Sequence, residues 1–258
     1  MGDPKNAYYH IASLVKGVRI LELLADKGEL GVSAVAERIG YNRATCHRFL
    51  ATFRDLGYVK KNQANQYQLT LRVLELGYKV ANRLEIRQIA RPYMLEISAA
   101  FHETINLGML DGLDVLHIEK IDSPEVLRMD SPIGSRAPLY CTALGKAILA
   151  NRNPEEIEAY LDAVTFHPQG PNCITSKEGL LEQLESVRQK GYAVDDEEFK
   201  AGLRCIAVPI FDHTKRADYA MSVSGFSLRM TYRVIEKIRD KLEDTGRRLS
   251  AHMGYTGK

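Results

Sequence analysis

The sequence predicts an α+β protein with two folded parts and a helix between them. In the first 72 residues, three short stretches with helical spacing precede two short β-rich runs. From Pro92 onward, β-rich runs bounded by turn signals alternate with amphipathic helices, which favours an antiparallel sheet flanked by helices. A chain of 258 residues, 45% of them hydrophobic, suits two domains. We therefore expect domains over residues 1–72 and 92–258, with a linker helix over residues 73–91.

The composition excludes several classes of protein. No apolar run approaches the roughly 18 residues that a membrane helix needs, so no membrane partner is expected. The first residues, MGDPKNAYYH, lack the apolar segment of a signal peptide, which predicts a cytoplasmic protein. The cysteines are scattered without a CxxC pair, so we expect them to be reduced. They are Cys46, Cys141, Cys173 and Cys205.

The charge is unevenly distributed along the chain. The net charge is +2, but residues 1–72 hold 11 basic and 6 acidic residues. A basic first quarter and a mildly acidic remainder indicate that the N-terminal part meets a polyanion. Chance variation among solvated helices would give the same asymmetry, so the charge needs support from motifs.

Three helices are predicted before residue 58. They cover residues 12–26, 33–40 and 43–57, with Ser33 and Asn42 as N-caps of the second and third. Gly40-Tyr41-Asn42 forms a tight link between these two helices. The residues expected to face the core are Leu14, Val18, Leu21, Leu24, Ala25, Val35, Ala36, Ile39, Cys46, Phe49, Leu50 and Phe53.

Two short helices joined by a tight turn are typical of a helix-turn-helix, whose second helix enters the major groove of DNA. After Gly57, Tyr58-Val59 and residues 67–69 indicate two strands around a polar loop, which would form a wing. Arginine reads guanine, while threonine and asparagine reach phosphates or base edges. The predicted DNA contacts are Arg19, Asn42, Arg43, Thr45, His47, Arg48, Lys60 and Lys61. His47 alone is more often a solvated helix residue, and helix-turn-helix geometry also occurs in proteins that do not bind DNA.

Residues 70–92 are predicted to be a long helical stretch that carries the chain between the domains, with Gly77 and Pro92 as breaks or ends. A helix of this kind can pair with its copy. Helix-turn-helix proteins commonly read two half-sites of a palindromic operator, so we expect a homodimer or homotetramer on double-stranded DNA.

The second domain is predicted to alternate helices and strands. Strands are expected over residues 104–110 and 113–121, joined by the hairpin signal Asp111-Gly112. Further strands are expected over 192–195, 203–211 and 218–225. Helices are expected over 93–103, 142–151, 154–164, 177–191 and 229–254.

A small anionic ligand would find a site in this domain. Thr142 caps a helix that begins with Ala143-Leu144-Gly145, and free amides at a helix start favour a carboxylate or phosphate. Ser222 and Ser224 alternate along a strand and so share a face, and a cupped sheet could join them to Asp195 and Cys205. The alternative is that both serines face solvent.

An enzyme is a competing interpretation. Cys205 could be a nucleophile with His117 or His102 as its base, but no local signature supports this, and a strand cysteine is more often a core residue. A zinc site from Cys141, Cys173, Cys205 and a histidine lacks ligand spacing. GxGxxG and P-loop motifs are absent from the sequence. We expect no catalytic residue, metal or cofactor. The remaining rival is a metabolite-binding protein or enzyme whose helix-turn-helix serves assembly only.

A long pattern in the second domain resembles a known family. Gly191, Asp195 and Glu198, followed after six residues by Cys205-Ile206-Ala207 and then Ile210-Phe211-Asp212, is similar to the signature of IclR-type transcriptional regulators. RATCHRFLATFRDLGYV resembles the family's recognition helix and wing entry, and TALGKAILA its pocket helix. The likeness runs from about Ala12 to Gly254. TINLGMLDG, HIEKIDS, LRMDSPIG, PLYCTALGK and GLRCIAVPIFD are most similar to the 2-keto-3-deoxygluconate repressor group, which governs sugar-acid and pectin-breakdown genes.

The resemblance implies a winged-helix domain, a linker helix and a GAF-like effector domain, with dimers that assemble into tetramers on DNA. It implies a repressor of a catabolic operon that responds to a small carboxylate or sugar acid. By motif position, the effector pocket would be lined by Val126, Met129, Ala143, Leu144, Asp195, Leu203, Cys205, Ser222 and Ser224.

Within the acidic run 195–198, we expect different roles for neighbouring residues. Asp195 would face the pocket and accept hydrogen bonds from hydroxyl groups of a sugar acid. Asp196 and Glu197 would be solvated turn residues, and Glu198 would bond backbone or Arg204.

Overall fold

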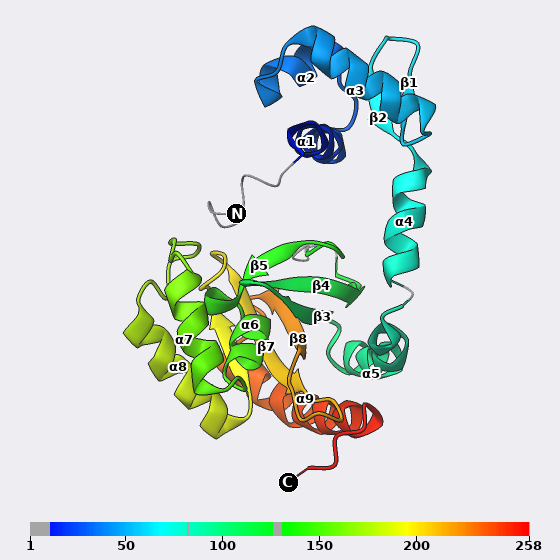
Figure 1. The fold of residues 1–258 in the computed structure, drawn as a ribbon. Coiled ribbons are helices and arrows are strands. Elements are labelled where there is room, and N and C mark those ends of the chain that lie inside the picture. Colours follow the sequence, from blue (N-terminus) through cyan, green and yellow to red (C-terminus); the bar gives the residue numbers. More distant parts are fainter. Residues whose placement is uncertain (1–10, 82, 126–130, 258) are drawn as a thin grey trace. The chain divides into compact units, whose positions relative to one another are not determined.

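The computed structural model describes residues 11–81, 83–125 and 131–257. The chain divides into two compact units, one up to Arg83 and one from Leu84 (Figure 1). Helices and strands occur in both, so the predicted α+β class is confirmed.

The first unit is built on three helices, α1 (Ala12–Lys27), α2 (Val32–Ile39) and α3 (Arg43–Asp55). The expected inward face of α1 is wrong at three positions, because Leu14, Val18 and Ala25 are exposed. Gly17 and Ile20 are buried instead, while the side chains of Leu14 and Val18 are 64% and 44% exposed. The reason is steric, because a side chain at Gly17 would come within 3.1 Å of the Phe53 ring on α3. The buried core of this unit consists of Ile20, Leu24, Val35, Cys46, Leu50, Val59 and Tyr67.

The predicted caps of α2 and α3 have different outcomes. Asn42 caps α3, as predicted, since its side chain accepts a hydrogen bond from the Thr45 amide at 2.7 Å. Ser33 is not the cap of α2, which begins one residue earlier with Gly31 in extended conformation. Leu30 exchanges both backbone hydrogen bonds with Tyr67, and this bridge fixes the extended chain that leads directly into Val32.

The predicted wing is present as an antiparallel pair, β1 (Val59–Lys61) and β2 (Tyr67–Leu69). Glu29, just before α2, holds the pair in place. Its carboxylate accepts hydrogen bonds from Asn62 at 2.8 Å and from Gln68. The wing is therefore tied to the helical core by side chains as well as by the Leu30–Tyr67 bridge.

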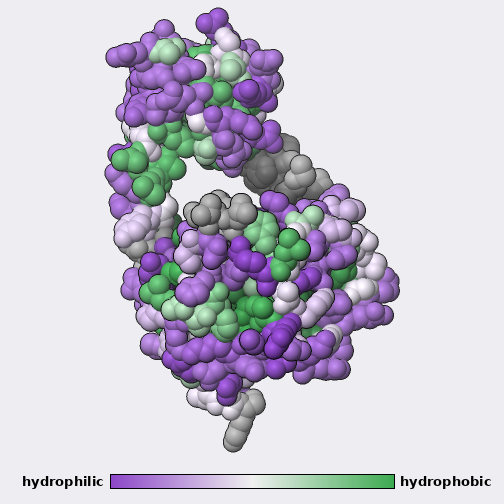
Figure 2. Space-filling view, turned by 180° about the vertical axis from the view of Figure 1, so that it is seen from behind, coloured by the Kyte–Doolittle hydropathy of each residue, from purple (hydrophilic) through white to green (hydrophobic). Residues whose placement is uncertain are grey.

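The linker helix expected over residues 73–91 is divided between two helices. These are α4 (Leu71–Ala81), in the first unit, and α5 (Glu85–Phe101), in the second. The expected breaks at Gly77 and Pro92 are wrong, since Gly77 lies inside α4 and Pro92 lies on the exposed face of α5 without ending it. Figure 2 shows apolar side chains along α4, where Leu71, Leu74 and Val80 are 64% exposed or more.

The second unit contains a six-stranded antiparallel sheet in the order β5-β4-β3-β8-β7-β6. Its strands are β3 (Thr104–Asp111), β4 (Asp114–Ile121), β5 (Arg136–Pro138), β6 (Ala193–Asp196), β7 (Leu203–Ile210) and β8 (Tyr219–Phe226). The predicted hairpin at Asp111-Gly112 joins β3 to β4, and Gly112 adopts the positive φ of +66° that this tight turn requires.

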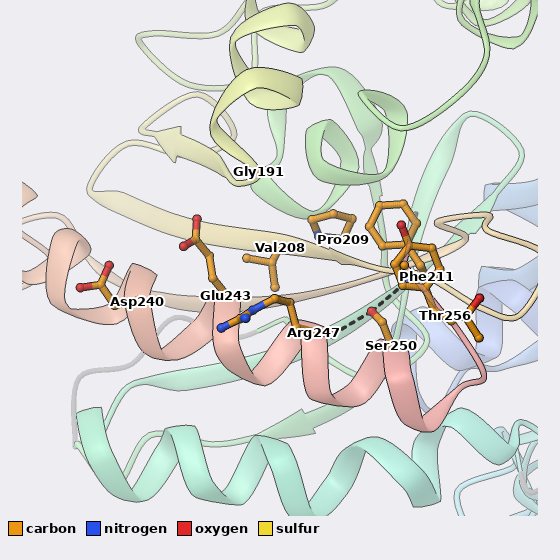
Figure 3. A pocket seen from close by; sticks show the side chains of 12 residues that line it. Gly191, Val208, Pro209, Phe211, Asp240, Glu243, Arg247, Ser250 and Thr256 are labelled. Atoms are coloured by element: carbon orange, nitrogen blue, oxygen red, sulfur yellow. Dashed lines mark hydrogen bonds between the residues drawn. The ribbon is translucent and has the colours of Figure 1, made fainter.

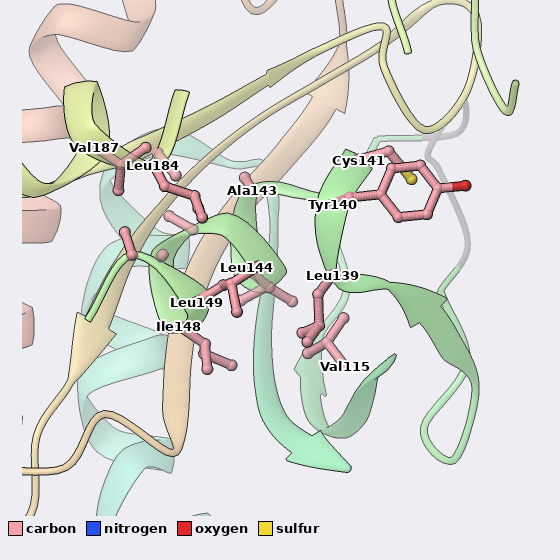
Figure 4. Close-up of a cluster of buried hydrophobic side chains, with 14 of the residues drawn as sticks. Val115, Leu139, Tyr140, Cys141, Ala143, Leu144, Ile148, Leu149, Leu184 and Val187 are labelled. Atoms are coloured by element: carbon pink, nitrogen blue, oxygen red, sulfur yellow. The ribbon is translucent and has the colours of Figure 1, made fainter. Parts of the chain in front are cut away.

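Helices cover both faces of this sheet (Figure 1). One face packs on α5 and α9 (Tyr232–His252) through a core cluster that includes Met94, Ile206 and Leu242. The other face packs on α6 (Ala143–Leu149), α7 (Pro154–Ala163) and α8 (Lys177–Lys190). Figure 4 shows this second cluster, in which Leu144 of α6 and Leu184 of α8 lie among buried side chains. None of the helices in the described part of the chain is long and apolar enough to cross a membrane.

Candidate DNA interface and candidate ligand cavity

Helix α3 presents the polar side chains expected of a recognition helix. Arg43, His47 and Arg48 are exposed, while Cys46 and Leu50 on the opposite side of the helix are fully buried. Thr45 is half-buried, and its amide is the one that Asn42 caps. The buried stripe fixes which side of α3 faces outward, so the basic side chains stand together on the solvent side.

A lysine that the sequence analysis missed belongs to the same surface. Lys16 on α1 lines a surface pocket of about 320 Å³ together with Thr45 and Arg48 of α3. Its ammonium lies 5.1 Å from the centre of the Tyr41 ring, which positions the long side chain. Arg19, one turn further along α1, is exposed but does not line this pocket. The sequence feature that could have indicated Lys16 is its position in α1, immediately before the buried Gly17.

The wing offers two more cations. Lys60 and Lys61 are both exposed on β1, opposite Gln68 and Tyr67 of β2. Lys61 lies 5.6 Å from the centre of the Tyr67 ring. Because strand neighbours point to opposite faces, the two ammonium groups leave the wing on different sides.

In the second unit, the strand register brings the predicted pocket residues together. Asp195 of β6 is paired with Cys205 of β7, and Cys205 with Ser224 of β8. Residues paired in this way share a face of the sheet, and Ser222 lies on that face two residues from Ser224. Both serines are more than nine-tenths buried, so the alternative that they face solvent is wrong.

These residues line a cavity of about 30 Å³ between the sheet and α6. The described residues around it are His117, Ser131, Ala137, Thr142, Ala143, Leu144, Asp195, Phe199, Leu203, Cys205, Ser222 and Ser224. Seven of the nine predicted effector residues are therefore brought together. The other two, Val126 and Met129, lie outside the described residues.

The start of α6 forms the wall opposite the sheet. The Thr142 hydroxyl caps the helix by accepting a hydrogen bond from the Gly145 amide at 3.1 Å, as predicted. Gly145 is required here, because a Cβ atom would lie 2.3 Å from the Cα of Leu139. The close approach presses α6 against the segment before it and leaves Ala143 and Leu144 facing the cavity.

Asp195 is held rigidly at one flank of the cavity. Its side chain is almost fully buried and accepts hydrogen bonds from the amides of Glu198 at 2.8 Å and Phe199 at 3.3 Å. Burial, with the nearby Glu198 carboxylate, raises the pKa of Asp195 to about 7. Near neutral pH this carboxyl can therefore either accept or donate a hydrogen bond.

The other acids of the run differ from expectation. Glu198 bonds the fully buried Lys146 of α6, not Arg204. Arg204 instead pairs with Asp196, which also accepts a hydrogen bond from Tyr232. Asp196 and Glu197 are thus not simply solvated, since both are half-buried and Glu197 accepts a hydrogen bond from the Gly202 amide at 2.8 Å.

Three further residues near the cavity were missed or misassigned. Lys146 is fully buried. The sequence could have indicated this, because Lys146 is a single lysine in the otherwise apolar helix ALGKAIL and a buried lysine needs a paired partner. Asn106 of β3 is buried and donates a hydrogen bond to the Ser224 hydroxyl at 3.1 Å, which orients that hydroxyl. His117 was weighed only as a catalytic base, yet it lines the cavity.

The geometry does not suit a cysteine nucleophile. Burial and the neighbouring Asp195 carboxyl raise the pKa of the Cys205 thiol well above its usual value. The thiolate that attacks a substrate is therefore not available near neutral pH. Across residues 11–81, 83–125 and 131–257, no group of three histidine, cysteine or acidic side chains is arranged to hold a metal ion.

A wider groove of about 690 Å³ runs between β7 and α9 (Figure 3). Val208, Pro209 and Phe211 form its floor, and α9 contributes Asp240 and Arg247. These two charges are already paired on the same helix, Asp240 with Arg239 and Arg247 with Asp244. None of the seven predicted effector residues that the structure describes lines this groove.

Comparison with known proteins assigns both units to one family. Residues 13–63 match the IclR helix-turn-helix domain, and residues 78–251 match the C-terminal domain described as "Bacterial transcriptional regulator IclR C-terminal". The chain is 39% identical to the HTH-type transcriptional regulator KdgR of Escherichia coli over 95% of its length and 94% of that protein. It is 33% identical to the regulator XynR of the same organism, with coverage of 95% and 98%.

A solved structure agrees in fold. The crystal structure of the Thermotoga maritima IclR protein superposes with a TM-score of 0.82 at 32% identity, covering 95% of this chain and all of that one. These similarities assign a regulatory rather than an enzymatic role. With a helix-turn-helix unit and a cavity-bearing unit that each match their counterparts, the chain belongs to the IclR family of transcriptional regulators.

Proposed function

We propose that this regulator represses a catabolic operon by binding a palindromic operator, and that a small carboxylate or sugar acid in the cavity of the second unit controls that binding. DNA contacts are assigned to residues 1–72 and effector contacts to residues 92–258. A protein with this role would act in the cytoplasm. The observation that carries the proposal is the cavity itself. The buried polar side chains of Asp195, Ser222 and Ser224 line it beneath α6.

The DNA part of the proposal rests on exposed cations placed by buried neighbours. Arg43 and Arg48 extend from α3, and Lys60 extends from the wing. Side chains of this kind contact phosphates and guanine edges when a recognition helix lies in the major groove. We add Lys16 to the predicted contacts, because it lines the same pocket as Arg48.

The ligand part rests on the polarity of the cavity. Hydroxyl groups of Thr142, Ser222 and Ser224 line it, together with the Asp195 carboxyl. Hydroxyl donors and a carboxyl that can exchange its proton suit a ligand with both a carboxylate and hydroxyl groups. The sugar-acid class is favoured over a purely apolar ligand for this reason.

Ligand binding must enlarge the cavity. A volume of about 30 Å³ holds only one or two water molecules, which is less than a six-carbon acid occupies. The ligand therefore favours a state in which the cavity is larger than in this structure. A differential preference of this kind is what allows a ligand to shift a regulator between a DNA-binding state and a released state.

Association into a homodimer or homotetramer is part of the proposal. Helices α1 and α4 expose large apolar side chains, among them Leu14, Leu71 and Leu74 at 64% to 75% exposure. Apolar surface of this extent is typical of interaction sites in soluble proteins. Two copies would supply the two recognition helices that a palindromic operator needs.

The first experiment is fluorescence anisotropy of the full-length protein on DNA from upstream of its own gene. Affinity is measured across a salt series, with and without 2-keto-3-deoxygluconate. We expect tight binding that weakens steeply with salt, because phosphate contacts release counterions, and release of the DNA by the acid. Binding that ignores this acid and a panel of other carboxylates would reject the effector class. Failure to bind any DNA segment specifically would reject the operator proposal.

A further inference from the structure

His117 occupies an unusual place in the sheet. It lies on β4 opposite Gly108 of β3, and Gly108 in turn lies opposite Ala220 of β8. Across these three strands, His117 is therefore followed by two small residues, Gly108 and Ala220. A Cβ atom on Gly108 would come within 2.5 Å of Val115 Cγ2 and 3.0 Å of Leu144 Cδ1, so the missing side chain makes room for Leu144 of α6 on this face of the sheet. Both His117 and Leu144 line the cavity.

The imidazole has unused hydrogen-bonding capacity. His117 is only 7% exposed, and its Nδ1 atom is buried without a hydrogen-bond partner in the part of the chain that the structure describes. The backbone of the residue is fixed on both sides, since its amide donates to Ser135 at 2.9 Å and its carbonyl accepts from Gly134 at 2.7 Å. A buried polar atom without a partner is costly. Its retention beside a cavity points to a partner that arrives with a ligand.

Two other polar groups of the cavity already have hydrogen-bond partners. Asp195 accepts two backbone hydrogen bonds, and Ser224 accepts one from Asn106. His117 stands on β4 and Asp195 on β6, with β3, β8 and β7 between them in the sheet. The two residues therefore approach the cavity from different strands, and a ligand that meets both must reach across the strands between them.

The ionisation of His117 defines what it can bind. Burial, with the nearby Lys120 charge, lowers the pKa of His117 to about 4. The ring is therefore neutral at physiological pH and has one donor and one acceptor nitrogen. A neutral ring of this kind suits an uncharged hydroxyl or carbonyl oxygen better than a carboxylate, which a cation would stabilise.

Building on the proposed function, we infer that His117 is a further ligand contact, and that its Nδ1 atom hydrogen-bonds an uncharged oxygen at the end of the ligand far from Asp195. This contact makes the regulator selective for hydroxylated acids over acids of the same length without hydroxyl groups. A site that leaves a buried polar atom unpaired discriminates strongly against a ligand that lacks the matching group.

The test compares two ligands and two variants by titration calorimetry on the full-length protein. The ligands are 2-keto-3-deoxygluconate and 2-ketohexanoate, which share chain length and the keto acid group but differ in hydroxyls. His117→Phe keeps a ring and removes both nitrogens. His117→Asn keeps a polar group near the position of Nδ1 and serves as the matched control.

We expect His117→Phe to weaken binding of the hydroxylated acid roughly tenfold and to leave 2-ketohexanoate unchanged or tighter. His117→Asn should retain most of the wild-type preference. The melting temperature of unliganded His117→Phe should not fall, because the change removes a buried atom that has no partner. A clear fall would instead assign His117 a structural role and overturn the inference.

Three other outcomes separate this inference from the proposed function. Equal affinities of wild type and His117→Phe for the hydroxylated acid would reject the contact while the proposed effector class stands. Equal weakening of both ligands would reject selectivity for hydroxyls. If the wild-type protein binds operator DNA but neither acid, the effector class is wrong and the role of His117 falls with it.

Discussion

The ammonium group of Lys146 pairs with the carboxylate of Glu198 inside the second unit, where Lys146 is fully buried. Lys146 belongs to α6, one wall of the cavity, and Glu198 follows β6 three residues after Asp195. The ion pair thus ties the acidic turn to the helix that covers the ligand cavity. It also keeps the Glu198 amide in place to donate to Asp195.

Replacing Lys146 by methionine should strongly destabilise the second unit. The change leaves the buried Glu198 carboxylate without its counter-charge, and loss of one partner of a buried pair typically costs about 3–5 kcal/mol. Chemical denaturation measures the free energy of unfolding. The double variant Lys146→Met/Glu198→Gln should recover much of the loss, because it removes the unpaired charge.

Lys177 supplies the matched control for this substitution. It pairs with Asp162 at 2.8 Å on the surface, where both side chains are about half exposed or more. Lys177→Met should cost less than about 1 kcal/mol. Similar losses for the buried and the exposed lysine would show that the Lys146–Glu198 pair is not the anchor that its burial indicates.

The ionisation of Asp195 should appear in the pH dependence of stability. Its folded-state pKa of about 7 lies above the ordinary value of 3.8, so the folded protein binds a proton that the unfolded chain has released. This contribution to stability is complete below pH 3.8 and is lost as the pH rises through 7. Asp195→Asn cannot ionise and keeps an oxygen that accepts from the Glu198 and Phe199 amides.

The expected signature is a difference between the two denaturation series. From pH 5 to 7, the free energy of unfolding of the wild type should fall relative to that of Asp195→Asn by about 1.4 kcal/mol for each pH unit. Above pH 7 the difference between the two proteins should become constant. The measurement is urea unfolding at half-unit steps of pH. Parallel curves would mean that Asp195 is ionised throughout this range.

Local signals were sufficient to predict most elements of the fold. The hairpin at Asp111-Gly112 and the caps at Asn42 and Thr142 depend on residues close in sequence, and all three are confirmed. The inward face of α1 depends on Phe53 of α3, whose ring packs against Gly17. A tertiary contact of this kind overrides the helical spacing of Leu14 and Val18 and leaves no trace near them in the sequence.

The cavity shows the same division between local and distant information. Strand alternation places Ser222 and Ser224 on one face, and the family motif adds Asp195 and Cys205. The sequence could have predicted that Lys146 is a buried charge. It could not have predicted that its partner is Glu198, which is 52 residues away. His117 faces the cavity because of the register between β3 and β4, including an irregularity at Leu107/Gly108 that spacing in one strand does not reveal.

Asn42 should have separable roles in folding and in DNA binding. Asn42→Ala removes the cap on α3 and should cost roughly 1 kcal/mol of stability. Asn42→Asp keeps a capping oxygen and adds a negative charge that the helix start favours. Because that charge would face DNA phosphates, Asn42→Asp should melt like the wild type yet bind the operator more weakly. Equal operator affinity of Asn42→Asp and wild type would place this residue away from the DNA.

Arg48 and Arg54 provide a matched pair on α3 that tests the recognition surface. Both are exposed, but Arg48 lies near Lys16 and Thr45, whereas Arg54 near the end of the helix pairs with Asp55 at 3.2 Å. Arg48→Ala should cost about 1–3 kcal/mol of operator binding, while Arg54→Ala should change it little.

Anisotropy titrations across a salt series then distinguish a phosphate from a base as the group that Arg48 binds. If Arg48 binds a phosphate, Arg48→Ala reduces the slope of log affinity against log salt by about 1. If it binds a base, the slope stays the same and the sequence preference relaxes. Equal effects at both positions would mean that the DNA does not follow the face of α3 on which Arg48 lies.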